Sequence, residues 1–199
     1  MTSKNSSSRL QLRQTIRQRR KSLTIDQQNL AEDQLADQLS TFCLTHSIKS
    51  LAIYLSNDGE LQTNHFIKWC WSNGIAVYLP VIHPFNKHHL LFLNYTRSTP
   101  MKKNRFAISE PRLNVQSVIA PSQLDALFTP LVAFDICGNR IGMGGGFYDR
   151  TLAHLNHSPV KKIGLAHDCQ QVEQVPIESW DMPLSKIITP TRVIECHEI

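Results

Sequence analysis

Glycine, arginine and aspartate gather in the segment PLVAFDICGNRIGMGGGFYDR, residues 130–150, in a pattern that could bind phosphate. Five of the eight glycines of the chain lie within residues 138–146. Glycine permits positive φ and lets the backbone approach a ligand closely, and free N–H groups at the start of a helix attract anions. Arg140 and Arg150 could clamp oxygen atoms, and Asp149 offers a hard oxygen ligand for a magnesium ion carried by phosphates. The segment is a candidate phosphate cradle, and the alternative is a tight turn with a purely structural role.

Apolar patterns place these glycines between a strand and a helix. Residues 131–134 are apolar and fit a buried strand, whereas residues 147–155 carry the apolar spacing of a helix. Gly142 and residues 144–146 are therefore expected to form a strand-to-helix turn. The turn matches neither common nucleotide-binding fingerprint, because GxGxxG would need glycine where Phe147 stands and no GxxxxGK[ST] can be read in the run.

Two further carboxylates lie in polar loops that follow apolar segments. Glu60 belongs to SNDGELQT (56–63), and Asp181 belongs to the proline-bounded loop VPIESWDMPL (175–184). Asp181 could complement Asp149, because magnesium at phosphate sites takes one or two carboxylates together with phosphate oxygens and waters. Both residues also have a plainer interpretation, since Asp58-Gly59 beside Glu60 is an ordinary turn and an aspartate in a proline-bounded loop is an ordinary turn former.

The positive charge of the chain is concentrated at its N-terminus. The formal net charge is +5, yet residues 1–21 hold seven basic residues and no acidic one, which leaves 14 basic against 16 acidic side chains, a net of −2, in the remainder. A remainder of this charge argues against a protein that grips nucleic acid along one face. Three interpretations of the basic segment stay open: a phosphate-binding helix, a basic tail or a cleaved transit peptide.

Capping patterns predict two helices at the start of the chain. Ser8 with Gln11 has the spacing of a capping box, and Thr24 begins a second box of the same kind. A helix that begins at Ser8 leaves residues 1–8 as a disordered leader. Residues 9–199 are then expected to form a single domain.

Three arginines of the first predicted helix share one face. Arg9, Arg13 and Arg17 stand four residues apart, and Leu12 and Ile16 supply a neighbouring apolar edge. Such a helix can lie on the body of the protein and point its guanidinium groups at a phosphate.

Strand-like and helix-like segments alternate through most of the chain. The strand-like segments are 48–55, 75–82, 90–95, 127–134, 161–167, 187–189 and 192–195, and the later helix-like segments are 63–73 and 147–155. This alternation predicts one α/β domain with a largely parallel sheet and with ligands at the carboxyl ends of its strands. A length of 199 residues suits one such domain with a real core.

Composition and cysteine usage indicate the cellular compartment in which the protein is expected to act. The chain has no apolar run of membrane-span length and no apolar stretch that a secretory signal would require. Its five cysteines are scattered without a CxxC pair. We therefore expect a cytoplasmic protein with reduced, structural thiols, without a membrane partner and without a nucleic-acid partner.

Several motifs in a fixed order resemble one known family. The glycine segment, GNRIGMGGGFYDR (138–150), is similar to the signature of the 5-formyltetrahydrofolate cyclo-ligases, also called methenyltetrahydrofolate synthetases. The likeness covers nearly the whole chain, through the basic first helix, YLSNDGELQT, AVYLPVI, Glu110-Pro111 and WDMPLSKIITP. It implies a Rossmann-like α/β fold, with a largely parallel sheet flanked by helices. It also implies an enzyme that uses ATP with magnesium to close 5-formyltetrahydrofolate into 5,10-methenyltetrahydrofolate, with release of ADP and phosphate. We expect this enzyme to be a monomer.

The resemblance also implies roles for particular residues. Arg140 and Asp149 would act in catalysis, and Asp149 and Asp181 would hold the metal. ATP would contact Arg9, Leu10, Gln11, Leu12, Arg13, Arg140, Ile141, Gly142, Met143, Gly144, Gly145, Gly146, Phe147 and Tyr148. The folate would contact Leu55, Glu60, Met143, Gly144, Gly145, Gly146 and Phe147.

The chemistry of this reaction suits the residue types. A formamide oxygen is a poor leaving group, so transfer of the terminal phosphoryl group of ATP to that oxygen converts it into a phosphate, which leaves when the neighbouring folate nitrogen attacks. Such a transfer needs positioning and charge neutralisation more than a covalent nucleophile, and arginines, backbone N–H groups and magnesium supply both. Glu60 would accept hydrogen bonds from the amino and ring N–H groups of the pterin.

Two other functions stay open on the residues alone. A sugar-phosphate isomerase or acyl-CoA transferase-like enzyme on a similar sheet would need a carboxylate poised for proton abstraction and no metal. A small basic RNA-binding module is the third possibility, and the net charge of −2 outside the first 21 residues argues against it.

Overall fold

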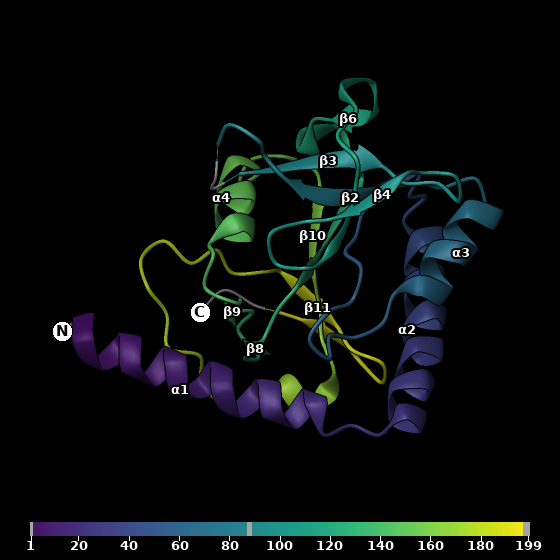
Figure 1. The fold of residues 1–199 in the computed structure, drawn as a ribbon. Coiled ribbons are helices and arrows are strands. Elements are labelled where there is room, and N and C mark those ends of the chain that lie inside the picture. The colour runs from purple at the N-terminus through teal and green to yellow at the C-terminus, as the bar shows by residue number, and fades with distance from the viewer. Residues whose placement is uncertain (1, 87–88, 197–199) are drawn as a thin grey trace.

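Strands and helices alternate in the computed structural model, which describes residues 2–86 and 89–196 (Figure 1). The helices are α1 (Thr2–Lys21), α2 (Ile25–Thr45), α3 (Asn64–Ser72) and α4 (Phe147–His154). The strands are β1 (Ser50–Ala52), β2 (Ala76–Ile82), β3 (Leu90–Asn94), β4 (Met101–Lys103), β5 (Ser109–Pro111), β6 (Val118–Ile119), β7 (Ala126–Pro130), β8 (Ala133–Phe134), β9 (Arg140–Ile141), β10 (Lys161–Leu165), β11 (Lys186–Ile188) and β12 (Val193–Glu195). Short 3₁₀ turns lie at Val115–Ser117, Pro121–Gln123 and Asp168–Gln170.

The central sheet is largely parallel, as the alternation of elements predicts. Its eight strands follow the order β12-β11-β10-β7-β1-β2-β3-β6. The pairs from β11 through β2 are parallel, whereas β12, β3 and β6 pair antiparallel at the two edges. The expected α/β architecture, a mostly parallel sheet flanked by helices in a single domain, is therefore confirmed.

The two faces of the sheet pack against different helices. Leu51 and Phe128 belong to a core shared with α2 and α3, and the adjacent residues Ala52 and Leu127 belong to a core shared with α4. Successive residues of a strand point to opposite faces, so each strand contributes to both cores. Figure 1 shows α2 and α3 together on one side of the sheet and α4 on the other.

The capping box at the start of α2 is confirmed. The N–H of Gln27 donates to Oγ1 of Thr24 at 3.2 Å, and the N–H of Thr24 donates to Oε1 of Gln27 at 2.9 Å. These reciprocal bonds satisfy two of the N–H groups that a helix start leaves without partners.

Helix α1 begins earlier than its capping pattern predicts. The predicted start at Ser8 is wrong, because α1 runs from Thr2, so residues 2–8 lie in the helix rather than in the expected disordered leader. The side chain of Asn5 donates to the Ile177 carbonyl at 3.0 Å, a contact with a distant loop that no local pattern reveals. Ile16 is fully buried in a cluster with residues 132–133, as its apolar edge predicts. Helix α1 thus packs on the body of the protein and is not a detached tail.

A small hairpin separates the predicted strand from the glycine turn. The segment 127–134 forms two strands, β7 and β8, and β8 pairs with β9 before the glycines begin. Asp135 holds the connection, because its Oδ1 accepts from the N–H groups of Cys137 at 3.0 Å and Asn139 at 3.1 Å. The hairpin carries Arg140 back toward the end of β7. The apolar pattern of the sequence predicts a strand that leads directly into the glycine turn, so it does not reveal this hairpin.

The cysteines are thiols without disulfide partners, as their spacing predicts. Cys43 and Cys70 are buried, and burial raises the pKa of the Cys43 thiol to about 12. A thiol with such a pKa stays protonated and unreactive at neutral pH, which fits a packing role. Among the helices that the structure describes, none combines the length and the apolar character needed to cross a membrane.

Candidate active site

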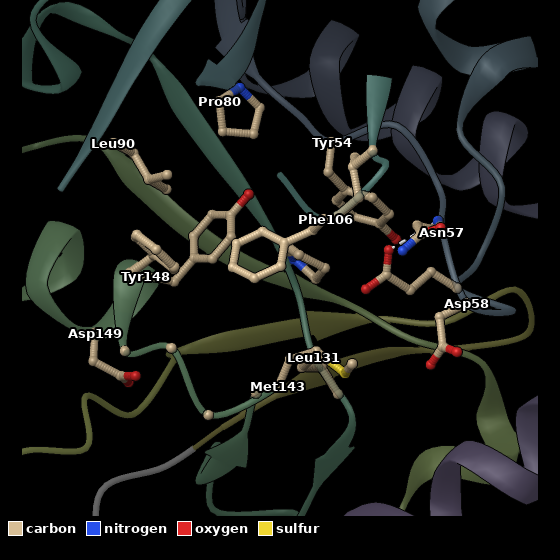
Figure 2. Close-up of a pocket in the computed structure, with 18 of the residues that line it drawn as sticks. Tyr54, Asn57, Asp58, Pro80, Leu90, Phe106, Leu131, Met143, Tyr148 and Asp149 are labelled. Carbon is tan, nitrogen blue, oxygen red and sulfur yellow. Dashed lines mark hydrogen bonds between the residues drawn. The ribbon is translucent and has the colours of Figure 1, made fainter. Parts of the chain in front are cut away.

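A cavity of about 870 Å³ opens where the carboxyl ends of β1 and β7 meet α1 and the glycine turn. A parallel sheet is expected to bind ligands at this edge. The cavity is lined by Ser6, Arg9, Arg13, Arg17, Tyr54, Leu55, Asn57, Asp58, Glu60, Leu79, Pro80, Ile82, Leu90, Asn104, Phe106, Ile108, Ser109, Glu110, Pro130, Leu131, Arg140, Gly142, Met143, Gly144, Gly145, Gly146, Phe147, Tyr148, Asp149, Glu178, Trp180 and Asp181. Figure 2 shows Asp149 at one side of this cavity and Asn57 and Asp58 at the other.

Arg140 lies at the Asp149 side of the cavity and has a guanidinium N–H group that donates to no described residue. Only 3% of the residue is exposed, and its Nη2 donates to Oδ1 of Asp149 at 2.6 Å. Burial lowers the pKa of the Arg140 guanidinium, and the charge of Asp149 opposes that effect. Its Nε is buried and has no hydrogen-bond partner among the residues described. Since buried polar atoms are nearly always paired, this orphaned donor is suited to an oxygen of a bound anion.

The glycine turn presents backbone to the cavity. Gly144 has φ +98° and Gly146 has φ +64°, whereas Gly142 and Gly145 have no positive φ. Gly146 is the N-cap of α4 and supplies no side-chain cap, so the first N–H groups of α4 stay available to an anion. A β-carbon at Gly145 would stand 2.7 Å from ring atoms of Phe147, so that glycine makes room for an aromatic side chain.

Helix α1 brings its arginine face to the same cavity. Arg9 forms a forked ion pair with Asp181 and donates from Nη1 to the Pro176 carbonyl at 2.7 Å. Arg13 donates from Nε to the Gly142 carbonyl at 2.8 Å, which ties α1 directly to the glycine turn. Burial lowers the pKa of the Arg13 guanidinium, and the nearby charge of Arg9 adds to this effect. The cations are thus crowded around a common space, an arrangement that favours a multiply charged anion.

Glu60 lies at the opposite side, in the turn that follows β1. Its Oε2 accepts from the N–H of Asn57 at 3.1 Å, and its Oε1 lies 4.0 Å from Nη2 of Arg20. Burial raises the pKa of the Glu60 carboxyl to about 7, and the charge of Arg20 opposes that rise. A carboxylate with one oxygen near a single cation can still accept hydrogen bonds from a ligand N–H group.

Apolar and aromatic side chains join the two charged sides. Leu79, Pro80, Leu90 and Met143 contribute apolar surface, and Figure 2 shows the ring of Tyr148 pointing into the cavity. Burial raises the pKa of the Tyr148 phenol well above its ordinary range, and the charge of Glu60 adds to the rise. Tyr148 is therefore a neutral phenol at every physiological pH. The cavity can hold a long ligand that is anionic at one end, flat and apolar in the middle and rich in N–H groups at the other end.

The proposed metal ligands differ in how far they are available. Asp149 uses Oδ1 for Arg140, and its Oδ2 has no hydrogen-bond partner in the part of the chain that the structure describes. Both oxygens of Asp181 are engaged by Arg9, and its Oδ2 also accepts from the N–H of Glu178 at 2.8 Å. Over residues 2–86 and 89–196, no cluster of three or more His, Cys, Asp or Glu side chains could hold a metal. One free carboxylate oxygen beside an anion site fits a magnesium ion that takes its other ligands from phosphates and water.

Most of the predicted site residues meet at the cavity. Those lining it are Arg9, Arg13, Leu55, Glu60, Arg140, Gly142, Met143, Gly144, Gly145, Gly146, Phe147, Tyr148, Asp149 and Asp181. Four do not line it: Leu10, Gln11, Leu12 and Ile141. The helical period turns Leu10 and Gln11 to solvent and Leu12 to the apolar cluster under α1, and Ile141 is fully buried in β9. Arg150, a candidate clamp, is exposed, and its Nη1 donates to the Gly145 carbonyl at 3.0 Å instead.

The turn between β4 and β5 is a part of the cavity that the sequence analysis did not assign. Oδ1 of Asn104 accepts from the N–H groups of Phe106 at 2.9 Å and Ile108 at 3.1 Å, and its Nδ2 donates to Oε2 of Glu110 at 3.1 Å. These bonds present Phe106, which is 54% exposed, at the rim of the cavity. The only sequence signals were Asn104 as a turn former and the Glu110-Pro111 pair, because no periodic pattern marks this region.

Sequence comparisons place the chain beside proteins of one kind. The model of the 5-formyltetrahydrofolate cyclo-ligase family matches residues 5–190. A protein of Haemophilus influenzae named 5-formyltetrahydrofolate cyclo-ligase is 50% identical over 184 residues, which cover 92% of this chain and 98% of that protein. A protein of the same name from Escherichia coli strain K12 is 49% identical over 180 residues, which cover 90% of this chain and 99% of that protein.

Solved structures share the fold. The 5,10-methenyltetrahydrofolate synthetase of Aquifex aeolicus superposes with a TM-score of 0.81 at 22% identity, over 96% of this chain and 94% of that one. The 5,10-methenyltetrahydrofolate synthetase of Mycoplasma pneumoniae superposes with a TM-score of 0.73 at 24% identity, over 92% of this chain and 98% of that one. At these identities the likeness supports the fold, and the sequence comparisons support the family.

Proposed function

The chain belongs to the 5-formyltetrahydrofolate cyclo-ligase family. We propose that its cavity binds ATP and 5-formyltetrahydrofolate end to end, so that the terminal phosphoryl group of ATP can be transferred to the folate. The ligase activity produces 5,10-methenyltetrahydrofolate, ADP and phosphate. The observation that carries the proposal is a single cavity with arginine side chains of α1 and β9 and the uncapped start of α4 at one side, and with Glu60 at the other.

The phosphates of ATP bind at the Arg140 side. Arg140 offers the buried Nε that has no partner among the described residues, and α4 offers N–H groups that no side chain caps. Arg9 and Arg13 extend the positive surface along α1. These donors are in place before the ligand arrives, so little reorganisation accompanies the charge that develops during phosphoryl transfer.

The folate binds between the glycine turn and the turn after β1. Glu60 accepts hydrogen bonds from the pterin, while Leu55, Met143 and Phe147 cover its faces. Tyr148, a neutral phenol beside both regions, can donate a hydrogen bond but cannot act as a base at neutral pH. The formyl group then faces the glycine backbone, where the terminal phosphoryl group of ATP arrives.

The reaction is a transfer followed by a ring closure. The formyl oxygen attacks the terminal phosphorus of ATP, the bond from that phosphorus to the bridging oxygen breaks, and ADP leaves. The neighbouring folate nitrogen then attacks the activated formyl carbon and gives up its proton to the departing phosphate, and the carbon–oxygen bond breaks to release that phosphate. Arg140 and the N–H groups of the glycine turn neutralise charge on the transferred group and position it, so the protein needs no covalent nucleophile.

Asp149 is the residue best suited to hold magnesium. Its Oδ2 is available within the described structure, and it lies on the same cavity as the arginines. A magnesium ion bound there would shield phosphate charge and help to orient the phosphates. Asp181 can join Asp149 only when Arg9 releases it, because both of its oxygens are bound.

The setting of the enzyme follows from its substrates. We propose that it acts in the cytoplasm, where ATP is available, and as a monomer, because the described residues of one chain supply both the phosphate side and Glu60. Neither a nucleic acid nor a membrane enters the reaction.

Ligand binding tests the proposal without turnover. Anything that binds the folded state preferentially raises the unfolding temperature, so ATP with Mg²⁺ and 5-formyltetrahydrofolate should each stabilise the protein separately. Stabilisation by both ligands supports the shared cavity. Stabilisation by a sugar phosphate or an acyl-CoA, and by neither proposed ligand, would contradict it.

The Asp149→Asn variant tests the magnesium assignment. The amide keeps the size and loses the charge, so we expect the Mg²⁺ concentration needed for half of the ATP-dependent stabilisation to rise by about tenfold. Stabilisation by 5-formyltetrahydrofolate alone should stay near the parental value. A variant that loses folate stabilisation to the same extent would show that Asp149 supports the cavity as a whole rather than a metal.

A further inference from the structure

Arg20, in the last turn of α1, is a buried cation that the phosphate side does not use. Its side chain has no exposed surface, and it does not line the cavity. Its Nε donates to the Asp58 carbonyl at 2.9 Å and its Nη2 donates to Oδ2 of Asp58 at 2.9 Å, while Nη1 lies 3.4 Å from the Leu131 carbonyl at the end of β7. A guanidinium is expensive to bury and is found inside proteins where its hydrogen bonds fix other groups.

The turn that receives these bonds is conformationally strained. Asp58 has φ +53°, a left-handed conformation that is uncommon for a residue with a β-carbon, and Gly59 follows with φ +76°. The turn holds one backbone bond of its own, from the N–H of Glu60 to the Asn57 carbonyl at 2.9 Å. Strained backbone persists where surrounding structure holds it, and here Arg17, Arg20 and Lys21 of α1 all bind Asp58. Hydrogen bonding from Arg17 in particular holds the pKa of Asp58 below its usual range, so Asp58 stays ionised.

The turn also packs directly on the helix. A β-carbon added to Gly59 would stand 3.3 Å from Cγ of Lys21, 3.5 Å from Cγ of Arg20 and 3.5 Å from the Arg20 carbonyl oxygen. Glycine is favoured here chiefly by the positive φ, because of these contacts only the one to the flexible Lys21 side chain would be tight. Glu60 is the next residue, so the place of its carboxylate depends on this contact.

Arg20 influences the charge of Glu60 as well as its place. In the part of the chain that the structure describes, Arg20 is the cation within ion-pair distance of Glu60, with Nη2 at 4.0 Å from Oε1. The other titratable groups that face Glu60 are Asp58 in the same turn, Tyr54 after β1 and Tyr148 of α4. None of these is a cation, and the charge of Asp58 disfavours ionisation of Glu60. Arg20 is thus the charge that favours the anionic form of Glu60, against the burial that disfavours it.

We propose that Arg20 is the positioning residue for substrate recognition at Glu60: it clamps the turn 56–60 between α1 and the end of β7 and so aims the Glu60 carboxyl group at the folate. The proposal rests on the assignment of Glu60 to the folate. Helix α1 then has two roles. Its first half carries Arg9 and Arg13 at the phosphate side, and Arg20 in its last turn positions Glu60 at the folate side.

The Arg20→Met variant tests the proposal, with Lys21→Gln as its matched control. Methionine fills similar space without a charge or a donor. Lys21 binds the same carboxylate of Asp58, but its side chain is 51% exposed and it does not line the cavity. We expect Arg20→Met to raise KM for 5-formyltetrahydrofolate by about tenfold or more, since small misplacements of a binding group are costly, while KM for ATP changes by less than about threefold. Lys21→Gln should leave both constants near the parental values.

A measurement without substrate separates this proposal from the assignment of the reaction. The ionisation of Glu60 can be followed by ¹³C NMR of its carboxyl carbon, assigned with Glu60→Gln. Burial raises the Glu60 pKa and the Arg20 charge lowers it, so the titration midpoint should lie near pH 7 in the parent and should move to higher pH in Arg20→Met. The amides of Asn57 and Glu60 should also exchange faster with solvent in Arg20→Met, and Lys21→Gln should change neither observable.

A second variant guards against a general loss of folding. Gly59→Ala keeps Arg20 and strains the left-handed backbone of the turn, so it should raise KM for the folate selectively as Arg20→Met does. If Arg20→Met does not fold, Gly59→Ala and Arg20→Lys take its place, with the same comparison of KM for the folate and KM for ATP. Arg20→Lys keeps the charge but loses the planar fork, so it too should raise KM for the folate selectively. Equal changes in both KM values, or a Glu60 midpoint and folate KM that stay parental in a folded variant, would overturn the proposal. A parent that shows the Glu60 titration but no cyclo-ligase activity would overturn the reaction and leave the clamp standing.

Discussion

The Arg140→Ala variant is expected to lose about 10²–10³ in kcat for ATP-dependent ring closure, which corresponds to roughly 2–4 kcal/mol of transition-state stabilisation. Arg140 is nearly fully buried and its Nε has no partner among the described residues, so no water-exposed cation can replace it when charge develops on the transferred phosphoryl group. The measurement is the initial rate at saturating ATP and folate, after a thermal melt has shown that the variant folds.

The exposed Arg150 provides the matched control. It lies in α4, ten residues after Arg140, and it does not line the cavity. Arg150→Ala should lower kcat by less than about threefold, because an exposed cation interacts weakly through water. Arg140→Lys should fall between the two variants, since it keeps the charge and loses the fork. A folded Arg140→Ala protein with a rate near that of Arg150→Ala would remove Arg140 from the catalytic role.

The Gly144→Val variant should abolish measurable turnover while the protein still folds. Gly144 has φ +98°, which a β-branched residue adopts only with strain, and a β-carbon there would come no closer than 3.9 Å to the described atoms, the nearest belonging to Arg13. The added β-carbon would therefore clash with no described protein atom, and the side chain would occupy cavity space beside Arg13. The rate of methenyl product formation and the unfolding temperature should be measured together.

Gly74→Val isolates the cost of the backbone conformation. Gly74 has φ +69° in the turn between α3 and β2, nothing described lies within 4 Å of its added β-carbon, and it lies outside the cavity. It should lose about 1–3 kcal/mol of stability from strain alone and keep its activity. If Gly144→Val folds and turns over like Gly74→Val, the glycine turn has only a structural role.

Local patterns in the sequence predicted most elements of the fold. The alternating segment 75–82 and the apolar segments 90–95 and 161–167 became β2, β3 and β10, because burial on a sheet requires such residues. The order of strands could not be derived, since pairing depends on contacts between distant segments. The β8–β9 hairpin was missed for a similar reason, because Asp135 fixes it through bonds within a turn that carries no apolar period.

Parts of the site were predictable because their chemistry depends on residue type. Glycines, arginines and Asp149 in one segment indicated a phosphate site, and the helical spacing of Arg9, Arg13 and Arg17 placed all three on the cavity. The same spacing could have excluded Leu10 and Gln11, which adjoin Arg9 in the sequence but lie on other faces of α1.

The remaining parts could not be predicted because they break general tendencies. Arginine is rarely buried, so the sequence alone favours an exposed Arg20 in a basic helix. The structure instead buries Arg20 against Asp58. Phe106 lies in the irregular segment between β4 and β5, where a single aromatic residue gives no periodic signal. Arg20 owes its position to hydrogen bonds with a distant turn, and Phe106 owes its position to the bonds that the Asn104 side chain makes within the β4–β5 turn.

The central claim is that one cavity couples ATP to ring closure of the folate, and a single reaction mixture tests it. The purified protein is incubated with ATP, Mg²⁺ and 5-formyltetrahydrofolate while the absorbance of 5,10-methenyltetrahydrofolate and the amount of ADP are followed together. The account predicts product only when all three are present, with ADP and methenyl product formed in equal amounts. Product formed without ATP consumption, or ATP consumed without methenyl product, would contradict it.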